Sequence, residues 1–182
     1  MKHLPIARRA HQLGLTLIET ATAMTVVSAV AGLAAPGFNS AIERRHLEGT
    51  AQQFETDVHY ARSLAVARNS PVRISFSADT DATCYVIHDG SANACQCAGN
   101  GAAVCTGAAE ALRTVRVATE TGVRVESNSR SILFDPAYGT STPTGTVQIL
   151  GRGGATIRQI INIMGRVRSC SPAPAIAGYR AC

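Results

Sequence analysis

The order of apolar and polar positions divides the chain into four stretches. Residues 1–14 are polar and basic, and residues 15–36 form an almost continuous apolar run. Over residues 37–69 apolar side chains recur every three to five positions between charged ones, which is the spacing of one face of an amphipathic helix. Over residues 71–182 the period becomes two, which is typical of half-buried strands. The pattern therefore predicts a long helix followed by a β domain.

Seven short segments in the last stretch alternate between apolar and polar residues, and Gly, Pro, Asp or Asn separate them. They cover residues 72–77, 84–88, 112–117, 123–125, 132–134, 147–150 and 157–164. Short strands joined by turn residues indicate an antiparallel sheet. A chain of 182 residues is too short for two well-buried domains, so we expect one α+β head, residues 37–182.

The apolar run is long enough to cross a bilayer. As a helix, residues 15–35 would span about 30 Å, the thickness of the hydrocarbon core, and the basic residues before them would stay on the cytoplasmic side. The carboxylate of Glu19 lies one turn inside this run, where it costs about 2.5–3.5 kcal/mol. We therefore expect a weak span whose carboxylate needs a partner charge.

A cleaved secretory signal has a similar basic start, and Ala29-Val30-Ala31 could serve as its cleavage site. A simple single-pass anchor is a second alternative. A signal peptide rarely tolerates an acid near the start of its apolar core, and a simple anchor explains neither Glu19 nor Gly14.

The sequence GLTLIE at residues 14–19, between a basic leader and Pro36, resembles the processing site of type IV pilins and type II secretion pseudopilins. The resemblance implies that a prepilin peptidase removes the leader, residues 1–14, by cleaving between Gly14 and Leu15. It also implies that Leu15 becomes N-methylated, although Phe is commoner in the family at this position. Glu19 would then pair with an N-terminal amine during filament assembly.

The same resemblance implies a location and partners. Residues 15–36 would be a single transmembrane helix in the inner membrane that later joins the filament core, and the head would be periplasmic. Once assembled in a pilus the head would be extracellular. The expected partners are other major and minor pilins, the prepilin peptidase and the inner membrane.

Later segments resemble FimT and GspH-type proteins specifically. Residues 61–74 look like the helix exit and first strand of that family, and residues 134–147 look like its mid-domain turn and strand. The resemblance covers most of residues 8–182 and is weakest between residues 79 and 110. It implies a type IV pilin-like fold, in which a long N-terminal helix packs on an antiparallel sheet.

Six cysteines in a small protein favour an oxidising compartment. Cys170 and Cys182 bracket a stretch with little regular pattern, and a disulfide between them would contribute roughly 3 kcal/mol. The other four lie within residues 79–110, a segment with four acids and no basic residue that we expect to be a long acidic loop: Cys84, Cys95, Cys97 and Cys105.

These four cysteines could in principle bind zinc, but the Cys-x-Cys spacing is not typical of zinc sites. No Cys-x-x-Cys redox motif is present either. Cys95 and Cys97 are too close to pair easily with each other, so each is expected to pair with Cys84 or Cys105. The sequence does not choose between these pairings.

The formal net charge of +5 conceals an uneven distribution. Residues 15–150 contain nine arginines and twelve acids, whereas residues 151–182 contain five arginines and no acid. Such an asymmetry is the electrostatic feature that attracts polyanions. A solvated basic surface that merely balances the acidic segment would give the same counts.

The segment Gly165-Arg166-Val167-Arg168 favours a polyanion. On a strand its two guanidinium groups would lie on one face about 6.5–7 Å apart, near the spacing of successive phosphates, and Gly165 would let the backbone turn before them. Followed by Cys170, the pattern resembles the C-terminal signature of FimT-type minor pilins, which implies DNA binding for natural transformation. The primary phosphate ligands would be Arg166 and Arg168, with three auxiliary ones: Arg152, Arg158 and Arg180.

Aromatic residues make up only 4% of the chain. Tyr179 could stack on a base, but we expect contacts mainly to the DNA backbone and binding that is largely independent of sequence. None of the five histidines forms a pair with metal spacing, and no nucleophile elbow, P-loop or dinucleotide motif is present. We therefore expect neither catalysis nor a metal or cofactor.

Three functions are compatible with these patterns. The first is a FimT-like minor type IV pilin that binds DNA for uptake. The second is a GspH-type pseudopilin of a type II secretion system, a structural subunit without DNA binding. The third is an ordinary secreted or anchored β domain. The arginines of the tail favour the first.

Overall fold

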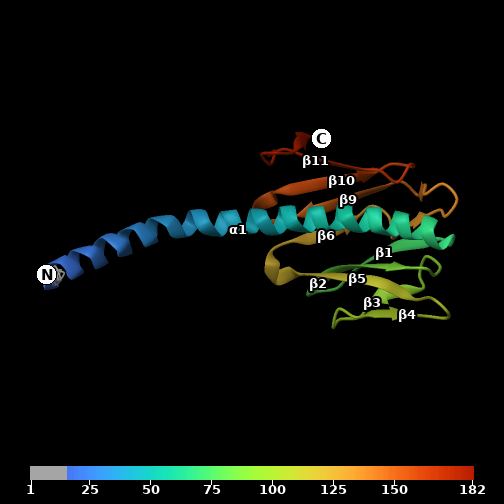
Figure 1. The fold of residues 1–182 in the computed structure, drawn as a ribbon, viewed down its shortest axis with the longest axis horizontal. Coiled ribbons are helices and arrows are strands. Elements are labelled where there is room, and N and C mark those ends of the chain that lie inside the picture. The colour runs from blue at the N-terminus through green and yellow to red at the C-terminus, as the bar shows by residue number, and fades with distance from the viewer. Residues whose placement is uncertain (1–15) are drawn as a thin grey trace, which may run out of the picture. The chain divides into compact units, whose positions relative to one another are not determined.

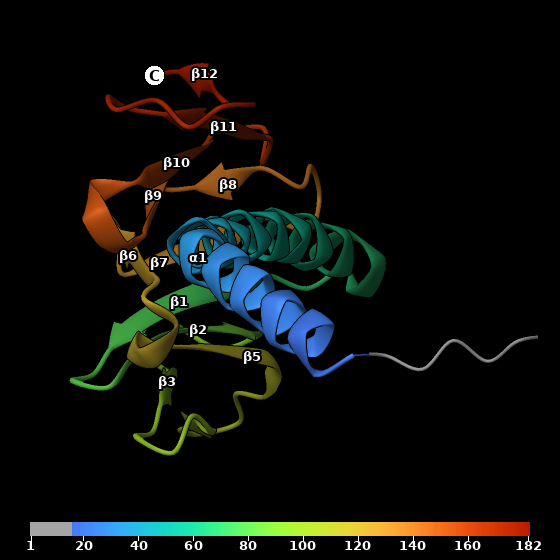
Figure 2. The ribbon, with the colours of Figure 1, turned by 90° about the vertical axis from the view of Figure 1, so that its left-hand side faces the viewer.

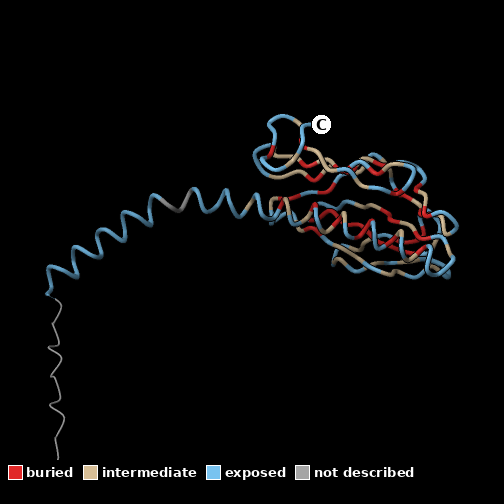
Figure 3. Tube along the Cα trace, turned by 45° about the horizontal axis from the view of Figure 1, so that its top comes forward, coloured by how far each residue is buried: buried red, intermediate tan, exposed pale blue. Residues whose placement is uncertain are grey.

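The computed structural model describes residues 16–182, which belong to two units, residues 16–40 and residues 41–182. Helix α1 (Leu17–Arg68) begins in the first unit and ends in the second (Figure 1). The side chains of residues 16–33 are all exposed, and Figure 3 shows this segment in the exposed colour. The proposed cleavage site, Gly14 and Leu15, lies outside the described residues.

Hydroxyl groups in the first unit are bonded within the helix. Thr16 caps the start of α1, because its Oγ1 accepts a hydrogen bond from the main-chain N–H of Glu19 at 3.3 Å. Thr20 and Ser28 donate their hydroxyls to carbonyls three or four residues earlier, each at 2.8 Å. The hydroxyls that interrupt the apolar run are thus satisfied without water, which lowers the cost of placing them in an apolar environment.

By length and composition, no single helix among residues 16–182 qualifies as a membrane span. One bent pair of helical segments, Leu17–Leu33 and Gly37–Arg68, qualifies only when the two are taken together.

The second unit contains two five-stranded sheets and a small hairpin (Figures 1 and 2). The first sheet has the order β5-β2-β1-β7-β8, the second has the order β12-β11-β10-β9-β6, and β3 pairs with β4. All pairs are antiparallel except β11 with β12, which is parallel. The strands are β1 (Val72–Ala78), β2 (Ala82–His88), β3 (Cys95–Cys97), β4 (Ala103–Cys105), β5 (Ala111–Ala118), β6 (Arg124–Ser127), β7 (Ser131–Phe134), β8 (Ser141–Thr142), β9 (Gly145–Leu150), β10 (Thr156–Ile161), β11 (Val167–Ser171) and β12 (Arg180–Ala181).

The part of α1 in this unit packs against both sheets. Its buried apolar positions repeat every three or four residues, as the sequence pattern predicts, and they form one core with the inward-facing strand residues. Gln159 of β10 adds a hydrogen bond of 2.8 Å from its side-chain amide to the carbonyl of Ala51. The helical contribution to the core is Leu47, Ala51, Phe54, Val58, Ala61 and Ala65.

The structure confirms the predicted α+β class, in which a long helix covers a mainly antiparallel sheet. It also corrects two details. The strand expected over residues 157–164 ends at Ile161, because Asn162 begins a turn. The segment 79–110 is not one long loop, because it contains β3 and β4 in addition to β2.

Disulfides hold the β3–β4 hairpin in place. Cys84 of β2 is bonded to Cys97 of β3, and Cys95 is bonded to Cys105 across the hairpin. Tyr85 and Ile87 of β2 face the helix core, whereas Cys84 and Val86 pack with the hairpin, so β2 is buried on both faces. The third disulfide joins Cys170 of β11 to Cys182.

Candidate nucleic-acid interface

Arg166 directly precedes β11 and Arg168 is the second residue of that strand, after a tight turn from β10. The turn is closed by hydrogen bonds from the N–H of Asn162 to the carbonyl of Arg166 at 3.1 Å and from the N–H of Gly165 to the carbonyl of Asn162 at 2.8 Å. The side chain of Asn162 also accepts the N–H of Arg166 at 3.0 Å. These bonds fix the backbone that presents the first arginine.

Gly165 is required in this turn for two reasons. Its φ is +68°, in the left-handed region that favours glycine. A Cβ at this position would also lie 2.9 Å from the carbonyl oxygen of Gly139 and 2.9 Å from Cδ of Arg62. The turn is therefore packed tightly against the loop that precedes β8.

Alternation along β10 and β11 places the arginines on the face of the second sheet opposite α1. Ile157, Gln159 and Ile161 are buried in the core, so Arg158 and Ile160 face outward. In the register, Arg158 is opposite Cys170 and Ile160 is opposite Arg168. Arg158 and Arg168 are thus diagonal neighbours, about 7–8 Å apart at Cα.

Arg180 joins this outward face through the C-terminal tail. It pairs with Cys170 in the parallel ladder between β11 and β12, and Cys170 in turn pairs with Arg158, so Arg180 lies two strands, or about 9–10 Å, from Arg158. The Cys170–Cys182 disulfide holds β12 against β11, and the Arg44 guanidinium donates to the carbonyl of Ala177 at 2.6 Å, which ties the tail to α1. Arg158, Arg166, Arg168 and Arg180 form what we call the arginine face.

Arg152 is not part of the arginine face. It follows β9 at the end of the sheet where Leu150 pairs with Thr156, whereas Arg166 follows the opposite end of β10, about 17 Å away along the strand. Its guanidinium lies 3.2 Å from Glu43 and donates to the carbonyl of Glu120 at 3.0 Å. The expectation that Arg152 assists the other arginines is therefore not supported by its position.

The charges of the arginine face are not neutralised by ion pairs within residues 16–182, where the three salt bridges involve Arg44, Arg113 and Arg152. Arg166, Arg168 and Arg180 are exposed, and Arg158 is half-buried with an Nε that has no hydrogen-bond partner among the described atoms. By register the acid on the outward face nearest to Arg158 is Glu126, two strands away, or about 9–10 Å. An anion that reached this face would meet donors without competing carboxylates between them.

The structure changes the interpretation of one aromatic residue, Tyr179, and of one basic residue, Arg124. Tyr179 is partly buried against the core, so its ring is not free to stack on a base. Burial, then nearby Glu48 and Glu55, raises the pKa of its hydroxyl. Arg124 of β6 was not identified as a ligand because it lies in the acid-rich part of the sequence. Its buried neighbours Val123 and Val125 place it on the same outward face, at the edge of the sheet.

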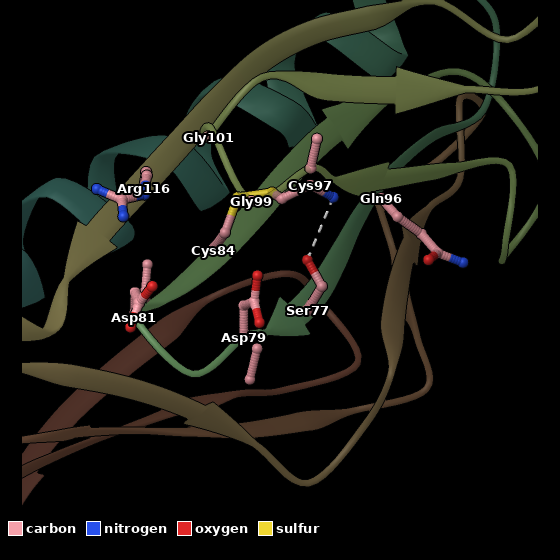
Figure 4. Close-up of a pocket in the computed structure, with 12 residues that line it drawn as sticks. Ser77, Asp79, Asp81, Cys84, Gln96, Cys97, Gly99, Gly101 and Arg116 are labelled. Carbon is pink, nitrogen blue, oxygen red and sulfur yellow. Dashed lines mark hydrogen bonds between the residues drawn. A yellow bond between two sulfur atoms is a disulfide. The ribbon is translucent and has the colours of Figure 1, made fainter.

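A separate pocket of about 140 Å³ lies between the end of β1 and the β3–β4 hairpin (Figure 4). Asp79, Asp81 and Arg116 line it together with the Cys84–Cys97 disulfide. Its acids disfavour a polyanion, and Oδ1 of Asp79 already accepts the N–H of Thr80 at 2.7 Å. The residues that the structure describes contain no group of three metal-ligating side chains.

Comparisons with known proteins identify both a family and a fold. The profile of the family described as type II transport protein GspH matches residues 50–165. A crystal structure of the type IV minor pilin FimU of Pseudomonas aeruginosa is similar at a TM-score of 0.53 and 22% identity, and the match covers 72% of this chain and 96% of FimU.

A second crystal form of FimU gives a TM-score of 0.50 at 21% identity, covering 69% of this chain and 97% of FimU. The minor pseudopilin EpsH of the Vibrio cholerae type 2 secretion system gives 0.47 at 14% identity, covering 69% of this chain and 97% of EpsH. No curated protein sequence matches the chain. The structural likeness to FimU shows that the chain has a type IV pilin-like fold.

Proposed function

This chain belongs to the family of type II transport protein GspH, and we propose that it is a FimT-like minor pilin that joins a type IV pilus and binds DNA. The family and the similar structures consist of minor pilins and pseudopilins, which are filament subunits and not enzymes. Partnership with other pilins follows from this membership. DNA binding for uptake in natural transformation is the proposed addition.

The observation that carries the proposal is the arginine face. Four arginines, from β10, β11, β12 and the turn before β11, lie on one outward surface, and the segment that contributes them has no acid. Phosphates provide the recurring negative charge that such a surface matches without reading bases. Binding should therefore be largely independent of sequence, with Kd around 10⁻⁴ to 10⁻⁶ M at physiological salt.

The route to the pilus is proposed from the N-terminal sequence. A prepilin peptidase would cut between Gly14 and Leu15, and Leu15 would then be methylated. Glu19, which is exposed in the first turn of α1, would find its partner amine in a neighbouring subunit. The head would face the periplasm from the inner membrane, an oxidising compartment in which three disulfides are stable.

The description of the matching family favours a second candidate, a GspH-type pseudopilin of a type II secretion system. Such a subunit would need the same fold and the same processing. It would not need DNA binding, so a measurement of DNA affinity distinguishes the two candidates.

The test uses full-length protein in a non-ionic detergent and a fluorescent duplex of random sequence, titrated at several salt concentrations. We expect wild type to bind with a steep salt dependence. The double variant Arg166→Gln/Arg168→Gln should bind at least tenfold more weakly, and the slope of log K against log salt should fall by about 2.

Arg152→Gln is the matched control, since it removes one arginine of the same tail that is already paired with Glu43. It should leave both affinity and slope nearly unchanged. If the double variant binds like wild type, or if Arg152→Gln weakens binding equally, the arginine face is not the site. If wild type does not bind DNA, the pseudopilin candidate is preferred.

A further inference from the structure

Tyr138 is the most exposed aromatic residue of the second unit. Its exposed fraction is 79%, whereas that of Tyr60 is 37%, and Phe54, Tyr85 and Phe134 are completely buried. An aromatic ring that stays exposed does not contribute the stabilising free energy that its burial in the core of the head would give. The ring is therefore a candidate for contact with something outside the chain.

The loop that carries Tyr138 is held rigidly. Oδ1 of Asp135 accepts the main-chain N–H groups of Ala137 at 2.9 Å and of Tyr138 at 3.1 Å. The N–H of Gly139 bonds to the carbonyl of Asp135 at 2.9 Å, and the N–H of Asp135 bonds to the carbonyl of Thr140 at the same distance. Because the backbone is already ordered, a ligand that contacts the ring would not need to order the loop.

This loop packs directly on the turn that presents Arg166. The N–H of Ser141 donates to the carbonyl of Ile163 at 2.8 Å, and its hydroxyl donates to the carbonyl of Asn162 at 2.6 Å. Gly165 approaches the carbonyl of Gly139 closely. Tyr138 directly precedes Gly139 in the chain, and Arg166 directly follows Gly165. The Cα atoms of Tyr138 and Arg166 are consequently within about 14 Å of each other.

The exposed side chains of the turn itself are apolar or basic: Ile163, Met164 and Arg166. Arg62 of α1 donates its Nε–H to the carbonyl of Gly139 at 2.9 Å. The local acid is Asp135, and its Oδ1 is occupied by the two N–H groups described above. We call Tyr138, Ile163 and Met164 the Tyr138 platform.

We infer that the Tyr138 platform stacks on unpaired bases, so that the protein prefers single-stranded DNA or frayed ends over a closed duplex. The inference rests on the proposed DNA binding, since Arg166 and Arg168 hold the phosphates of the same strand. In a duplex the base faces are covered by neighbouring bases, whereas a single strand offers them to an aromatic ring. One stacked base should raise affinity on the order of tenfold.

A neighbouring pilin is the other kind of occupant that an exposed apolar surface could have. The charges favour DNA, because Arg62 bonds to Gly139 next to Tyr138, Arg166 follows the adjoining turn, and neither arginine forms an ion pair among the described residues. A basic aromatic surface complements a polyanion with exposed bases, and the test below distinguishes the two occupants.

The experiment compares binding of the full-length protein, in non-ionic detergent, to a 20-nucleotide oligo(dT) and to a 20-base-pair duplex. Wild type should bind the single strand more tightly. Tyr138→Leu should weaken oligo(dT) binding on the order of tenfold and leave duplex binding nearly unchanged, whereas Tyr138→Phe should keep both. Tyr60→Leu, which changes another exposed tyrosine, should have no effect on either.

A spectroscopic measurement accompanies the titration. The chain has no Trp, so its intrinsic fluorescence comes mainly from tyrosine. Adding oligo(dT) should quench part of this fluorescence in wild type, and the quenching should be lost in Tyr138→Leu. Thermal unfolding of each variant, followed by circular dichroism, establishes that the heads are folded.

The outcomes separate the inference from the proposed function. If Tyr138→Leu weakens both DNA forms equally, or neither, the platform does not stack on bases and the inference fails, while duplex binding by wild type still supports the proposed function. If Tyr138→Leu retains oligo(dT) binding but loses crosslinking to a neighbouring pilin in cells, the platform is a subunit interface. If wild type binds neither oligonucleotide, the proposed function fails as well.

Discussion

The hydroxyl of Tyr85 in β2 donates a hydrogen bond of 2.7 Å to the Asp57 carboxylate in α1. Asp57 is completely buried, and its other oxygen lies 3.0 Å from Nε of Arg113 in β5. Gln53, one turn earlier in α1, donates to the same oxygen as Tyr85 at 3.1 Å. Burial, followed by the bond to Asp57, raises the pKa of Tyr85 strongly. This network joins the helix to β5 and β2, which are the edge strand of the first sheet and its neighbour.

Removing Arg113 should therefore destabilise the head more than removing the Tyr85 hydroxyl. Arg113→Met leaves a buried carboxylate without its cation, which costs about 3 kcal/mol or more, whereas Tyr85→Phe removes one hydrogen bond and costs about 1–2 kcal/mol. Chemical denaturation of the two variants measures the difference in unfolding free energy. In the double variant Arg113→Met/Asp57→Asn part of the loss should return, and equal losses in all three would contradict the role given to the ion pair.

The position of Asp57 on the core side could have been read from the sequence. It lies three residues after Phe54 and four before Ala61, so it shares the face of α1 that those residues bury. The general pattern of charged residues between apolar ones in this helix does not hold for Asp57, which is buried. The helical period does not identify the partners of Asp57. Tyr85 and Arg113 belong to β2 and β5, and the pairing of these strands depends on the whole sheet.

The tail disulfide should contribute to DNA binding through Arg180. Replacing Cys170 and Cys182 by Ser releases β12 from β11, so Arg180 should no longer be held on the arginine face. The salt dependence of DNA binding should fall by about one unit, and the unfolding free energy should fall by up to roughly 3 kcal/mol. Arg180→Gln should reproduce the change in salt dependence without the loss of stability. If it changes neither, Arg180 does not contact DNA.

The stability of the head should decrease below about pH 6.5 because of His88. This residue is completely buried, its Nδ1 accepts the N–H of Gly90 at 3.1 Å, and its Nε2 lies 2.8 Å from Oγ of Ser75. The ring is therefore neutral with the proton on Nε2. Burial first, and then the nearby charge of Arg73, lowers its pKa from 6.5, while Asp89 opposes them.

The sign follows from linkage. A folded pKa below the unfolded one gives stability that is complete above about pH 6.5 and is lost as the pH falls through the folded value. Melting temperatures between pH 7.5 and pH 5 measure the effect. His59→Gln, at an exposed position of α1, should keep the pH dependence of wild type. A flat profile for wild type over this range would refute the assignment.

The N-terminal proposal predicts the fate of two variants in cells. Gly14→Val should accumulate as an unprocessed precursor, visible as a band of higher mass, because the peptidase would lose its cleavage site. Glu19→Val should be processed and inserted but should assemble poorly, because the helix would lack the carboxylate that pairs with an amine. Normal processing of the first variant, or normal incorporation of the second into filaments, would count against the proposal.

The arginine face illustrates what a sequence can and cannot provide for a site. Alternation predicts Arg166 and Arg168 on one face from local spacing alone, and the structure places Arg168 on the outward face of β11 with Arg166 directly before the strand. Counting arginines in the same tail placed Arg152 with them, although the register separates Arg152 from Arg166 by the length of β10. Proximity between strands depends on the register, and the register depends on the core residues of the whole sheet.

Gly165→Ala should damage the turn before the arginines more than Gly153→Ala damages η2 (Arg152–Gly154). The two glycines have nearly the same φ, +68° and +69°, so the cost of the left-handed backbone, about 1 kcal/mol, is common to both. A Cβ on Gly153 would meet no atom within 4 Å, whereas one on Gly165 would meet the carbonyl oxygen of Gly139 at 2.9 Å. Because that oxygen belongs to the backbone, the turn itself has to shift.

The shift should displace Arg166 as well as lower stability. Gly165→Ala is therefore expected to lose more unfolding free energy than Gly153→Ala and to weaken duplex binding severalfold, whereas Gly153→Ala should bind DNA like wild type. Denaturation curves and the salt-dependent titration measure the two effects on the same samples. Equal stability of the two variants would show that the contact with Gly139 relaxes freely, and unchanged DNA affinity of Gly165→Ala would show that the turn does not position Arg166.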